Sequence, residues 1–222
     1  MITVIPSLPA QSYEELAALS EALKGSASEL QVDIVDGKFV PSVSWPFTEA
    51  EPMEELKKLK TISNNQSLAI DCMIAEPEQY LDLFVSVGAK RVIVHMGSTK
   101  KFEHILNHAK THGYKVGLAC TNDTYSDEME KYIGNFDYVQ VMGIRHVGQQ
   151  GQPFDERTPE TVRALRAAHP DMEIAVDGGV NKETIPKLKQ AGANRFAPGS
   201  AVAKQADPKA AYEALVLLAG AG

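Results

Sequence analysis

Two aspartates, each near the end of a short β-branched run, are the residues of this sequence best suited to proton chemistry. Asp33 lies in the stretch 31–36 (QVDIVD), and Asp177 lies in the stretch 176–180 (VDGGV). In the second stretch a glycine pair lets the backbone turn tightly and expose its N–H groups before a helix begins. A carboxylate beside an anion-binding turn indicates proton transfer on a small phosphorylated molecule.

The composition excludes some partners and leaves others open. The chain has 222 residues, of which 44% are hydrophobic and 23% charged, and its formal net charge is −7. This balance is typical of a globular protein and argues against nucleic acid as the main partner. It does not argue against a small anion, because such a ligand is held by local N–H groups and not by net charge.

Cysteine usage and the N-terminus predict a cytoplasmic protein. The two cysteines, Cys72 and Cys120, make no disulfide framework, which favours a reducing compartment. Residues 1–5 lack the charged leader and long apolar region of a signal peptide, and no run of the sequence is long and apolar enough to span a bilayer. We therefore expect no membrane partner.

Strand and helix patterns alternate eight times along the chain, with no Gly/Ser linker between them. The predicted strands are Ile2–Ile5, Leu30–Val35, Leu68–Met73, Arg91–His95, Val116–Cys120, Tyr138–Met142, Glu173–Val176 and Arg195–Ala197. The predicted helices are Tyr13–Leu23, Pro52–Lys60, Pro77–Val87, Phe102–His112, Asp127–Tyr132, one from Thr158, Lys182–Gln190 and Pro208–Leu218. This pattern predicts an α/β protein, a single (β/α)8 TIM barrel domain over residues 1–222, with a doubly wound open sheet as the alternative.

In such a barrel the active site lies at the carboxyl ends of the strands, where three aspartates are expected to meet. Asp33, Asp71 and Asp177 follow or end different strands. Like charges this close raise one another's pKa unless a cation neutralises them. Any one of the three, taken alone, is equally well explained as a helix cap or a loop residue. Three together indicate a functional site, because buried carboxylates need partners.

Glycine turns supply the expected phosphate site. Gly178 and Gly179 follow the seventh strand, and Gly199 and Ser200 follow the eighth. The long sixth loop adds Gly148 and Gly151. Barrels of this class often bind phosphate at the loops after strands seven and eight. The alternative is that these are tight turns with no ligand.

Several stretches, in order along nearly the whole chain, resemble the ribulose-phosphate 3-epimerase family. They are residues 5–8 (IPSL), 33–41 (DIVDGKFVP), Met73 followed by Pro77, 176–180 (VDGGV) and 199–201 (GSA). The family's members are ribulose-phosphate-binding barrels that interconvert ketopentose phosphates by moving a proton at C3. The resemblance therefore implies a phosphorylated ketose as substrate, and no organic cofactor.

The resemblance also assigns roles to single residues. It implies that Asp33 and Asp177 are the two acid/base residues, one on each face of the sugar, because a single base could return the proton only to the side it came from. Ser7 would touch the substrate hydroxyls, and Met73 and Met142 would shield the enediolate. The glycine turns (Gly148, Gly151, Gly178, Gly179, Gly199 and the adjoining Ser200) would hold the phosphate.

The sequence departs from the family at the metal site. The family binds a divalent metal with two histidines and the two catalytic aspartates, and the histidine positions are Gln31 and Asp71 here. The resulting all-oxygen set of Gln31, Asp33, Asp71 and Asp177 favours Mg²⁺ or Mn²⁺ over Zn²⁺ or Fe. Arg145 in the sixth loop is a second departure; it either supplies positive charge at the site or, as we favour, is a solvated loop cation.

Other functions are weaker matches. Related decarboxylases and hexulose-phosphate synthases use a D-x-K-x-x-D motif, and Val35 stands where that lysine is needed. His95 is a site acid or, as we favour, a satisfied structural group, and Cys120 is expected in the core. The main rival is a non-catalytic or altered-specificity phosphosugar-binding barrel. The retention of both Asp33 and Asp177 favours the isomerase. Because the exposed helices of barrels commonly pair, a homo-oligomer is compatible with either function.

Overall fold

The segment of residues 3–8 closes the sheet into a barrel in the computed structural model, which describes residues 1–63, 65–149 and 151–220. Strand β1 (Thr3–Val4) pairs in parallel with β9 (Arg195–Ala197), and β2 (Ser7–Leu8) pairs in parallel with β3 (Glu29–Val35). Between them Pro6 has no N–H to donate, but its carbonyl accepts a 3.0 Å hydrogen bond from the Gln31 backbone N–H. The predicted first strand Ile2–Ile5 is confirmed as the shorter β1, and the structure adds β2 after Pro6, which the sequence did not predict.

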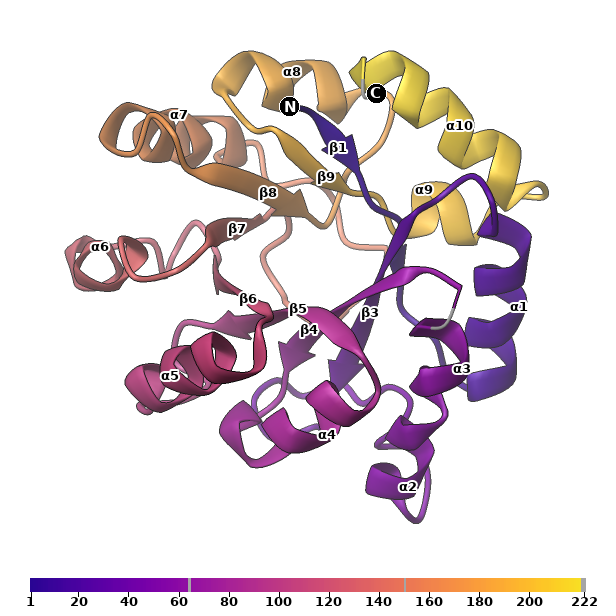
Figure 1. The fold of residues 1–222 in the computed structure, drawn as a ribbon. Helices are drawn as coiled ribbons and strands as arrows, with labels where there is room; N and C mark the ends of the chain where they lie inside the picture. The colour runs from indigo at the N-terminus through magenta and orange to yellow at the C-terminus, as the bar shows by residue number, and fades with distance from the viewer. Residues whose placement is uncertain (64, 150, 221–222) are drawn as a thin grey trace.

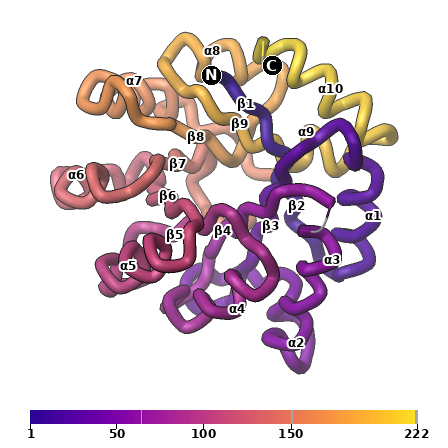
Figure 2. Tube along the Cα trace, in the orientation of Figure 1, coloured from indigo at the N-terminus to yellow at the C-terminus, as the bar shows by residue number. Residues whose placement is uncertain are grey.

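The remaining strands run in parallel around the barrel in chain order. They are β4 (Ser67–Met73), β5 (Ala89–His95), β6 (Lys115–Cys120), β7 (Tyr138–Met142) and β8 (Glu173–Asp177). The sheet order is β1-β9-β8-β7-β6-β5-β4-β3-β2, and its two ends are neighbours along the chain. Figures 1 and 2 show the helices around the outside of this ring. The predicted TIM barrel is confirmed, and the open sheet is excluded by the hydrogen bonds of the 3–8 segment to both β9 and β3.

The helices follow the predicted pattern with local differences. They are α1 (Tyr13–Leu23), α2 (Pro52–Lys57), α3 (Leu59–Ser63), α4 (Leu81–Ser86), α5 (Phe102–His112), α6 (Asp127–Ile133), α7 (Thr158–Ala168), α8 (Thr184–Ala191), α9 (Ser200–Ala203) and α10 (Pro208–Ala219). The predicted helix Pro52–Lys60 is split into α2 and α3, and the helix predicted at Pro77 begins as a 3₁₀ turn, η1 (Pro77–Tyr80). The short α9, directly after Gly199, was not predicted.

The interior of the barrel contains a separate small hydrophobic cluster. Tyr138 of β7 is its one large side chain, and it packs among small or branched side chains that include Ala69, Ile93 and Ala119. Gly117 on the neighbouring strand leaves the space for it, since a Cβ at that position would overlap the tyrosine ring. The larger core, between the outer face of the sheet and the helices, fixes the strands that carry the polar residues at both ends of the barrel.

The strand beginnings hold a partly buried network of ion pairs. Arg91 Nη1 donates to Glu173 Oε1 at 2.6 Å, and Arg195 Nη2 donates to Glu29 Oε1 at 2.6 Å. Both guanidinium groups lie near the Tyr138 ring, at 4.9 and 5.9 Å from its centroid. Two positive and two negative charges therefore neutralise one another beneath the central tyrosine.

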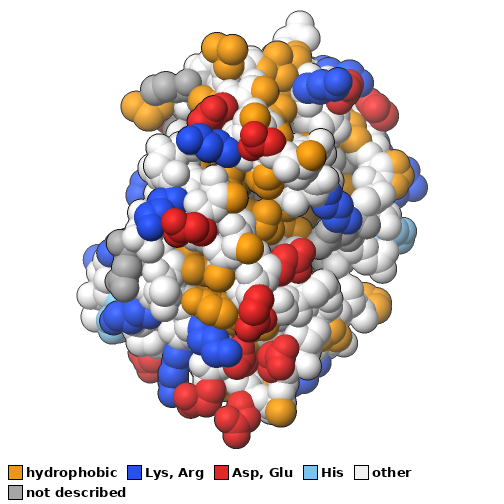
Figure 3. All heavy atoms as spheres, turned by 90° about the vertical axis from the view of Figure 1, so that its right-hand side faces the viewer, with side chains coloured by type: hydrophobic (Ala, Val, Ile, Leu, Met, Phe, Trp, Pro, Cys, Tyr) orange, Lys and Arg blue, Asp and Glu red, His pale blue; other side chains and the backbone are white. Residues whose placement is uncertain are grey.

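The outer surface mixes charged and apolar side chains. Figure 3 shows the side of the molecule where α1, α9 and α10 lie, with hydrophobic atoms gathered in a band between charged groups. On α10, Leu217 is 83% exposed and Leu218 is 43% exposed. Within the described residues, none of the helices has the length and apolar character needed to cross a membrane. The homo-oligomer and the single-domain organisation stay predictions.

Candidate active site

The structure brings the three aspartates together at the carboxyl ends of the strands. Asp33 of β3 and Asp71 of β4 are paired in register, and Asp177 is the last residue of β8. One carboxylate oxygen from each lies within 4.8 Å of the others, and all three side chains are buried. Buried carboxylates this close together are costly to ionise unless hydrogen-bond donors or cations stabilise their charges. Their partners therefore decide what the site can do.

The Gln31 amide lies at the centre of this cluster. On β3 its side chain points to the same face as Asp33, two residues further on. Its Nε2 donates to Asp177 Oδ2 at 2.7 Å and to Asp33 Oδ1 at 3.0 Å. A third, longer contact of 3.5 Å reaches Asp71 Oδ2. One NH₂ group therefore bridges the two aspartates that were predicted to be catalytic.

Asp71 lies behind the other two carboxylates and is fully buried. Gln140 Nε2 donates to Asp71 Oδ2 at 2.7 Å, and His95 Nε2 lies 2.7 Å from Asp71 Oδ1. The Phe39 ring packs on His95 with a centroid distance of 5.7 Å. Each oxygen of Asp71 thus has a protein partner, and His95 takes the structural role that the sequence favoured.

The surroundings of Asp33 and Asp177 raise the pKa of both carboxyl groups. Burial, followed by the charge of Asp71, raises the pKa of Asp33 to about 7, against the hydrogen bonds from Gln31 and Ser7. The Ser7 hydroxyl donates to Asp33 Oδ2 at 2.7 Å. Burial, followed by the charges of Asp33 and Asp71, raises the pKa of Asp177 well above its usual value. Near neutral pH the pair can therefore offer one acid and one base.

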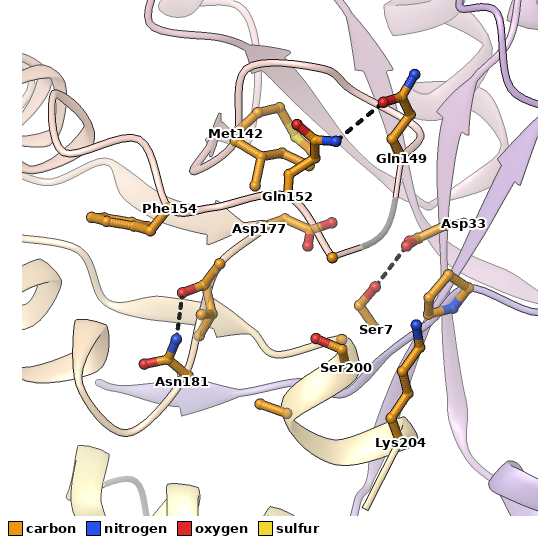
Figure 4. A pocket seen from close by; sticks show the side chains of 18 of the residues that line it. Ser7, Asp33, Met142, Gln149, Gln152, Phe154, Asp177, Asn181, Ser200 and Lys204 are labelled. Atoms are coloured by element: carbon orange, nitrogen blue, oxygen red, sulfur yellow. Dashed lines mark hydrogen bonds between the residues drawn. The ribbon is translucent and has the colours of Figure 1, made fainter.

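Asp33 and Asp177 face a cavity of about 1200 Å³ at the mouth of the barrel, large enough for a phosphorylated sugar. Figure 4 shows Ser7, Asp33, Asp177 and Ser200 around this pocket. All the predicted substrate-binding residues line it: Ser7, Met73, Met142, Gly148, Gly151, Gly178, Gly179, Gly199 and Ser200. Gln31 and Asp71 are not among its lining residues, so only two of the four polar residues in the predicted metal set can face a ligand there.

The glycines of the two turns have different reasons to be glycine. Gly178 has φ +88° and Gly179 has φ +66°, and a Cβ on them would come within 2.8 Å of Ile144 and 2.9 Å of Phe154, respectively. Backbone conformation and packing therefore account for this pair without any ligand. At Gly199 a Cβ would find nothing closer than Ser7, at 3.9 Å. The missing side chain at Gly199 leaves open space on the pocket side.

Some residues of the site were not singled out from the sequence. Gln140 donates a hydrogen bond to Asp71. Because Gln140 lies on the same face of β7 as Met142, the alternation of side chains along that strand indicates its place in the site. Asn181 Nδ2 donates to the Gly179 carbonyl at 3.2 Å and holds the turn in shape. Lys204 and Lys182 are the lysines among the described residues that line the cavity, and no motif pointed to them.

Arg145 and Cys120 do not face the cavity. Arg145 Nε lies 3.6 Å from Asp155 Oδ2, and its side chain is 65% exposed. It lines a separate hollow of about 290 Å³ together with His146. Burial raises the pKa of the Cys120 thiol to about 12, as expected of a core cysteine. This geometry favours the interpretation of Arg145 as a loop cation.

The cluster as it stands does not suit a divalent cation. Glutamine binds such ions through its carbonyl oxygen, whereas here the NH₂ group of Gln31 points at the carboxylates. Gln140 likewise directs Nε2 to Asp71. A cation among the three carboxylates would meet N–H donors in the place of ligand atoms, although the carboxylates themselves are close enough together to hold one.

The fold defines the chain as a TIM barrel, and solved structures share it over nearly the whole length. A 3-hexulose-6-phosphate synthase from Salmonella typhimurium matches with a TM-score of 0.75 at 17% identity, covering 99% of this chain and 98% of that one. A 3-keto-L-gulonate-6-phosphate decarboxylase from Vibrio cholerae matches with a TM-score of 0.73 at 14% identity, covering 99% and 98%. At these identities the likeness shows the fold alone.

The chain belongs to the ribulose-phosphate 3 epimerase family, whose model matches residues 3–203. The ribulose-phosphate 3-epimerase of Eremothecium gossypii is 31% identical over 211 residues, which cover 93% of this chain and 88% of the relative. That of Bacillus subtilis is 30% identical over 217 residues, covering 95% and 96%. The predicted resemblance is confirmed, and the chain is by family a sugar-phosphate epimerase.

Proposed function

We propose that the protein moves a proton at C3 of a ketose phosphate through an enediolate, with Asp33 and Asp177 as its two acid/base groups. The observation that carries the proposal is that both carboxylates line one cavity and are bridged by a single amide nitrogen, at 3.0 and 2.7 Å. They belong to β3 and β8, which are separated in the sheet by β9 and the segment of residues 3–8. Two acids from different walls of the barrel are what inversion at one carbon requires.

The protonation of the pair supports the chemistry. One aspartate in its carboxylate form removes the C3 proton, and the other, in its neutral form, returns a proton to the opposite face of the enediolate. The raised pKa of both groups favours retention of such a proton near neutral pH. When the other epimer binds, the two exchange roles, so the reaction runs in either direction.

The other predicted contacts fit around this step. Ser7 donates to Asp33 and lies beside the substrate hydroxyls, while Met73 and Met142 shield the enediolate from water. The turns at Gly178 and Gly199 face the phosphate with backbone N–H groups, near Lys204. If an ion is taken up, Mg²⁺ or Mn²⁺ suits this oxygen-rich set better than Zn²⁺ or Fe, but Gln31 would serve it only after turning Oε1 inward. The proton transfer requires no organic cofactor.

Hydrogen exchange at C3 tests the proposal. The protein is incubated with D-ribulose 5-phosphate in D₂O, and deuterium at C3 and formation of the epimer are followed by NMR. We expect both to appear with the wild type, and formation of the epimer to be lost with Asp33→Asn and with Asp177→Asn, because each variant lacks the acid/base group on one face of the sugar. Exchange with another ketose phosphate in place of ribulose 5-phosphate would keep the mechanism and correct the substrate.

The second candidate is a phosphosugar-binding barrel without activity or with altered specificity. The cavity of about 1200 Å³ has room for hexulose as well as pentulose phosphates, which is compatible with this candidate. Binding of pentulose and hexulose phosphates without C3 exchange in any of them would establish this candidate and end the isomerase proposal.

We also infer that the protein is cytoplasmic, because its free and buried cysteines, Cys72 and Cys120, would stay reduced there. Cell fractionation tests this, and recovery of the protein from an oxidising compartment would contradict it.

A further inference from the structure

We propose that the Gln31 amide takes the place of a cation in the carboxylate cluster, so that this epimerase holds its two catalytic aspartates without a divalent metal ion. In this role Gln31 is a positioning residue: its side chain is buried, does not line the cavity, and acts on the substrate only through Asp33 and Asp177. The inference rests on the proposed function for its activity measurements, but not for its binding measurements.

The described residues supply the cluster with its own donors. One oxygen of Asp33 accepts a hydrogen bond from Gln31 Nε2, and the other accepts one from the Ser7 hydroxyl. One oxygen of Asp71 accepts a hydrogen bond from Gln140 Nε2, and the other lies at hydrogen-bond distance from His95 Nε2. A divalent ion attracts carboxylate lone pairs, and here each of these four oxygens already has a hydrogen-bond partner from the protein.

Asp177, the third carboxylate, has donors from two directions. Its Oδ2 accepts the 2.7 Å bond from Gln31, and the backbone N–H of Gly178 also hydrogen-bonds to its carboxyl group. A cation would have to displace the first of these bonds and lose most of its hydration water in a buried site. The existing bonds therefore compete directly with the ion.

The orientation of the Gln31 amide also opposes a cation. Rotated by half a turn, Gln31 would place its carbonyl oxygen 2.7 to 3.0 Å from two carboxylates, where like partial charges repel. Without a cation, the three carboxylates thus favour the orientation in which the NH₂ group of Gln31 faces them. With a cation in the middle, the preference would reverse. The same residue cannot serve both arrangements at once.

The bridge explains how two buried acids stay side by side. An NH₂ group has two hydrogens, and the two short bonds of Gln31 use both of them, one for each catalytic aspartate. The 3.5 Å contact to Asp71 is the longest of the three, and it places the negative charge of Asp71 behind the amide. Gln31 therefore fixes the distance between the two acids from a position outside the substrate's reach.

Metal binding is the primary test and needs no turnover. Purified protein, stripped with EDTA and dialysed, is titrated with Mn²⁺ by electron paramagnetic resonance. We expect no specific binding in the wild type, with a Kd on the order of 1 mM or weaker. The Gln31→Glu variant replaces the NH₂ group by oxygen and is expected to bind Mn²⁺ at least about 100-fold more tightly, as a fourth carboxylate would. Gln190→Glu, on the exposed surface of α8, makes the same charge change and should bind like the wild type.

Activity is the second readout. C3 exchange by the wild type should be unchanged within about twofold by EDTA or by added Mn²⁺. Gln31→Met, which keeps the length but removes the donors, should lower kcat by about 10- to 100-fold with little change in KM, because only the positioning of the acids is lost. One Mn²⁺ bound per wild-type chain with micromolar affinity, or exchange abolished by EDTA and restored by Mn²⁺, would overturn the inference. If no sugar phosphate exchanges at all, the proposed function fails while the Mn²⁺ titration of the wild type still decides this question, even if both Gln31 variants fail to fold.

Discussion

The barrel gathers acidic side chains at both of its ends, but it pairs them with arginines at only one of them. Beneath Tyr138, two arginines meet two glutamates at hydrogen-bond distance. At the opposite end, three aspartates meet amides, a hydroxyl and an imidazole, and none of their interactions among the described residues involves lysine or arginine. The two clusters lie in the same fold and differ in what balances them.

This difference separates stability from chemistry. A paired buried charge is inert, because both partners are held in their ionised forms. An unpaired buried carboxylate is held close to its protonation equilibrium, and that makes it usable as an acid or a base at a cost in stability. In TIM barrels the same division runs between the two ends of the strands. Single substitutions can therefore break one end at a time.

The largest effect is expected from Asp33→Asn or Asp177→Asn at the unbalanced end. Each removes one of the two proposed proton carriers and should lower the rate of epimer formation by at least about 1000-fold. Binding of the sugar phosphate, measured by calorimetry, should change far less, because the glycine turns are intact. Epimer formation within tenfold of the wild type in either variant would remove that aspartate from the proposed mechanism.

At the balanced end, Arg195→Met should act on stability alone. It leaves Glu29 with one of its cationic partners missing, and breaking a buried pair costs about 3 kcal/mol of unfolding free energy. Urea denaturation followed by circular dichroism measures this loss. Exchange per folded molecule should stay within about twofold of the wild type. A variant of full stability and low activity would show that the two ends are coupled.

Stability should depend on pH through the unbalanced end. A carboxyl group with a higher pKa in the folded state binds its proton more tightly there, so it favours folding at low pH and loses that advantage as the pH rises. For Asp33 the loss extends from its usual 3.8 to about 7. Relative to wild type, Asp33→Asn should therefore gain about 4 kcal/mol of stability between pH 4 and pH 8. Parallel stability curves for the two proteins would contradict the raised pKa.

The smallest effect is expected from Arg145→Ala, in the loop after β7 and outside both clusters. Its exposed pair with Asp155 contributes at most about 1 kcal/mol, and the same carboxylate keeps a 2.7 Å ion pair with Arg157. Both the exchange rate and the affinity for sugar phosphate should stay within about twofold of the wild type. A tenfold rise in KM would instead assign Arg145 to the substrate.

The sequence predicted the barrel and the positions of the acids, because both depend on local patterns. Alternation along each strand and the rule for parallel sheets suffice to bring Asp33, Asp71 and Asp177 to one end. The interruption between β1 and β2 falls at Pro6, which has no N–H group to donate to a neighbouring strand. The break between α2 and α3, by contrast, carries no proline or glycine to announce it.

What the sequence could not predict are contacts between distant strands. Asp71 lies deeper in the barrel than Asp33 and Asp177. Its position depends on how Gln140 and His95 pack around it. The direction of the Gln31 amide depends on Asp177, 146 positions away along the chain. Neither follows from spacing, and both decide whether the cluster resembles a metal site or a set of hydrogen-bonded acids.

The closing segment of residues 3–8 also bears on how the protein is made. It leaves the ribosome before every other strand, yet β1 pairs with β9, the last strand of the sheet to be synthesised. Until then a nascent chain has β3 through β8 but no closed ring, and Ser7, which bonds to Asp33, has only the pairing of β2 to hold it. A polypeptide that still lacks β9 therefore has an open sheet, and the ring closes only after that strand has emerged.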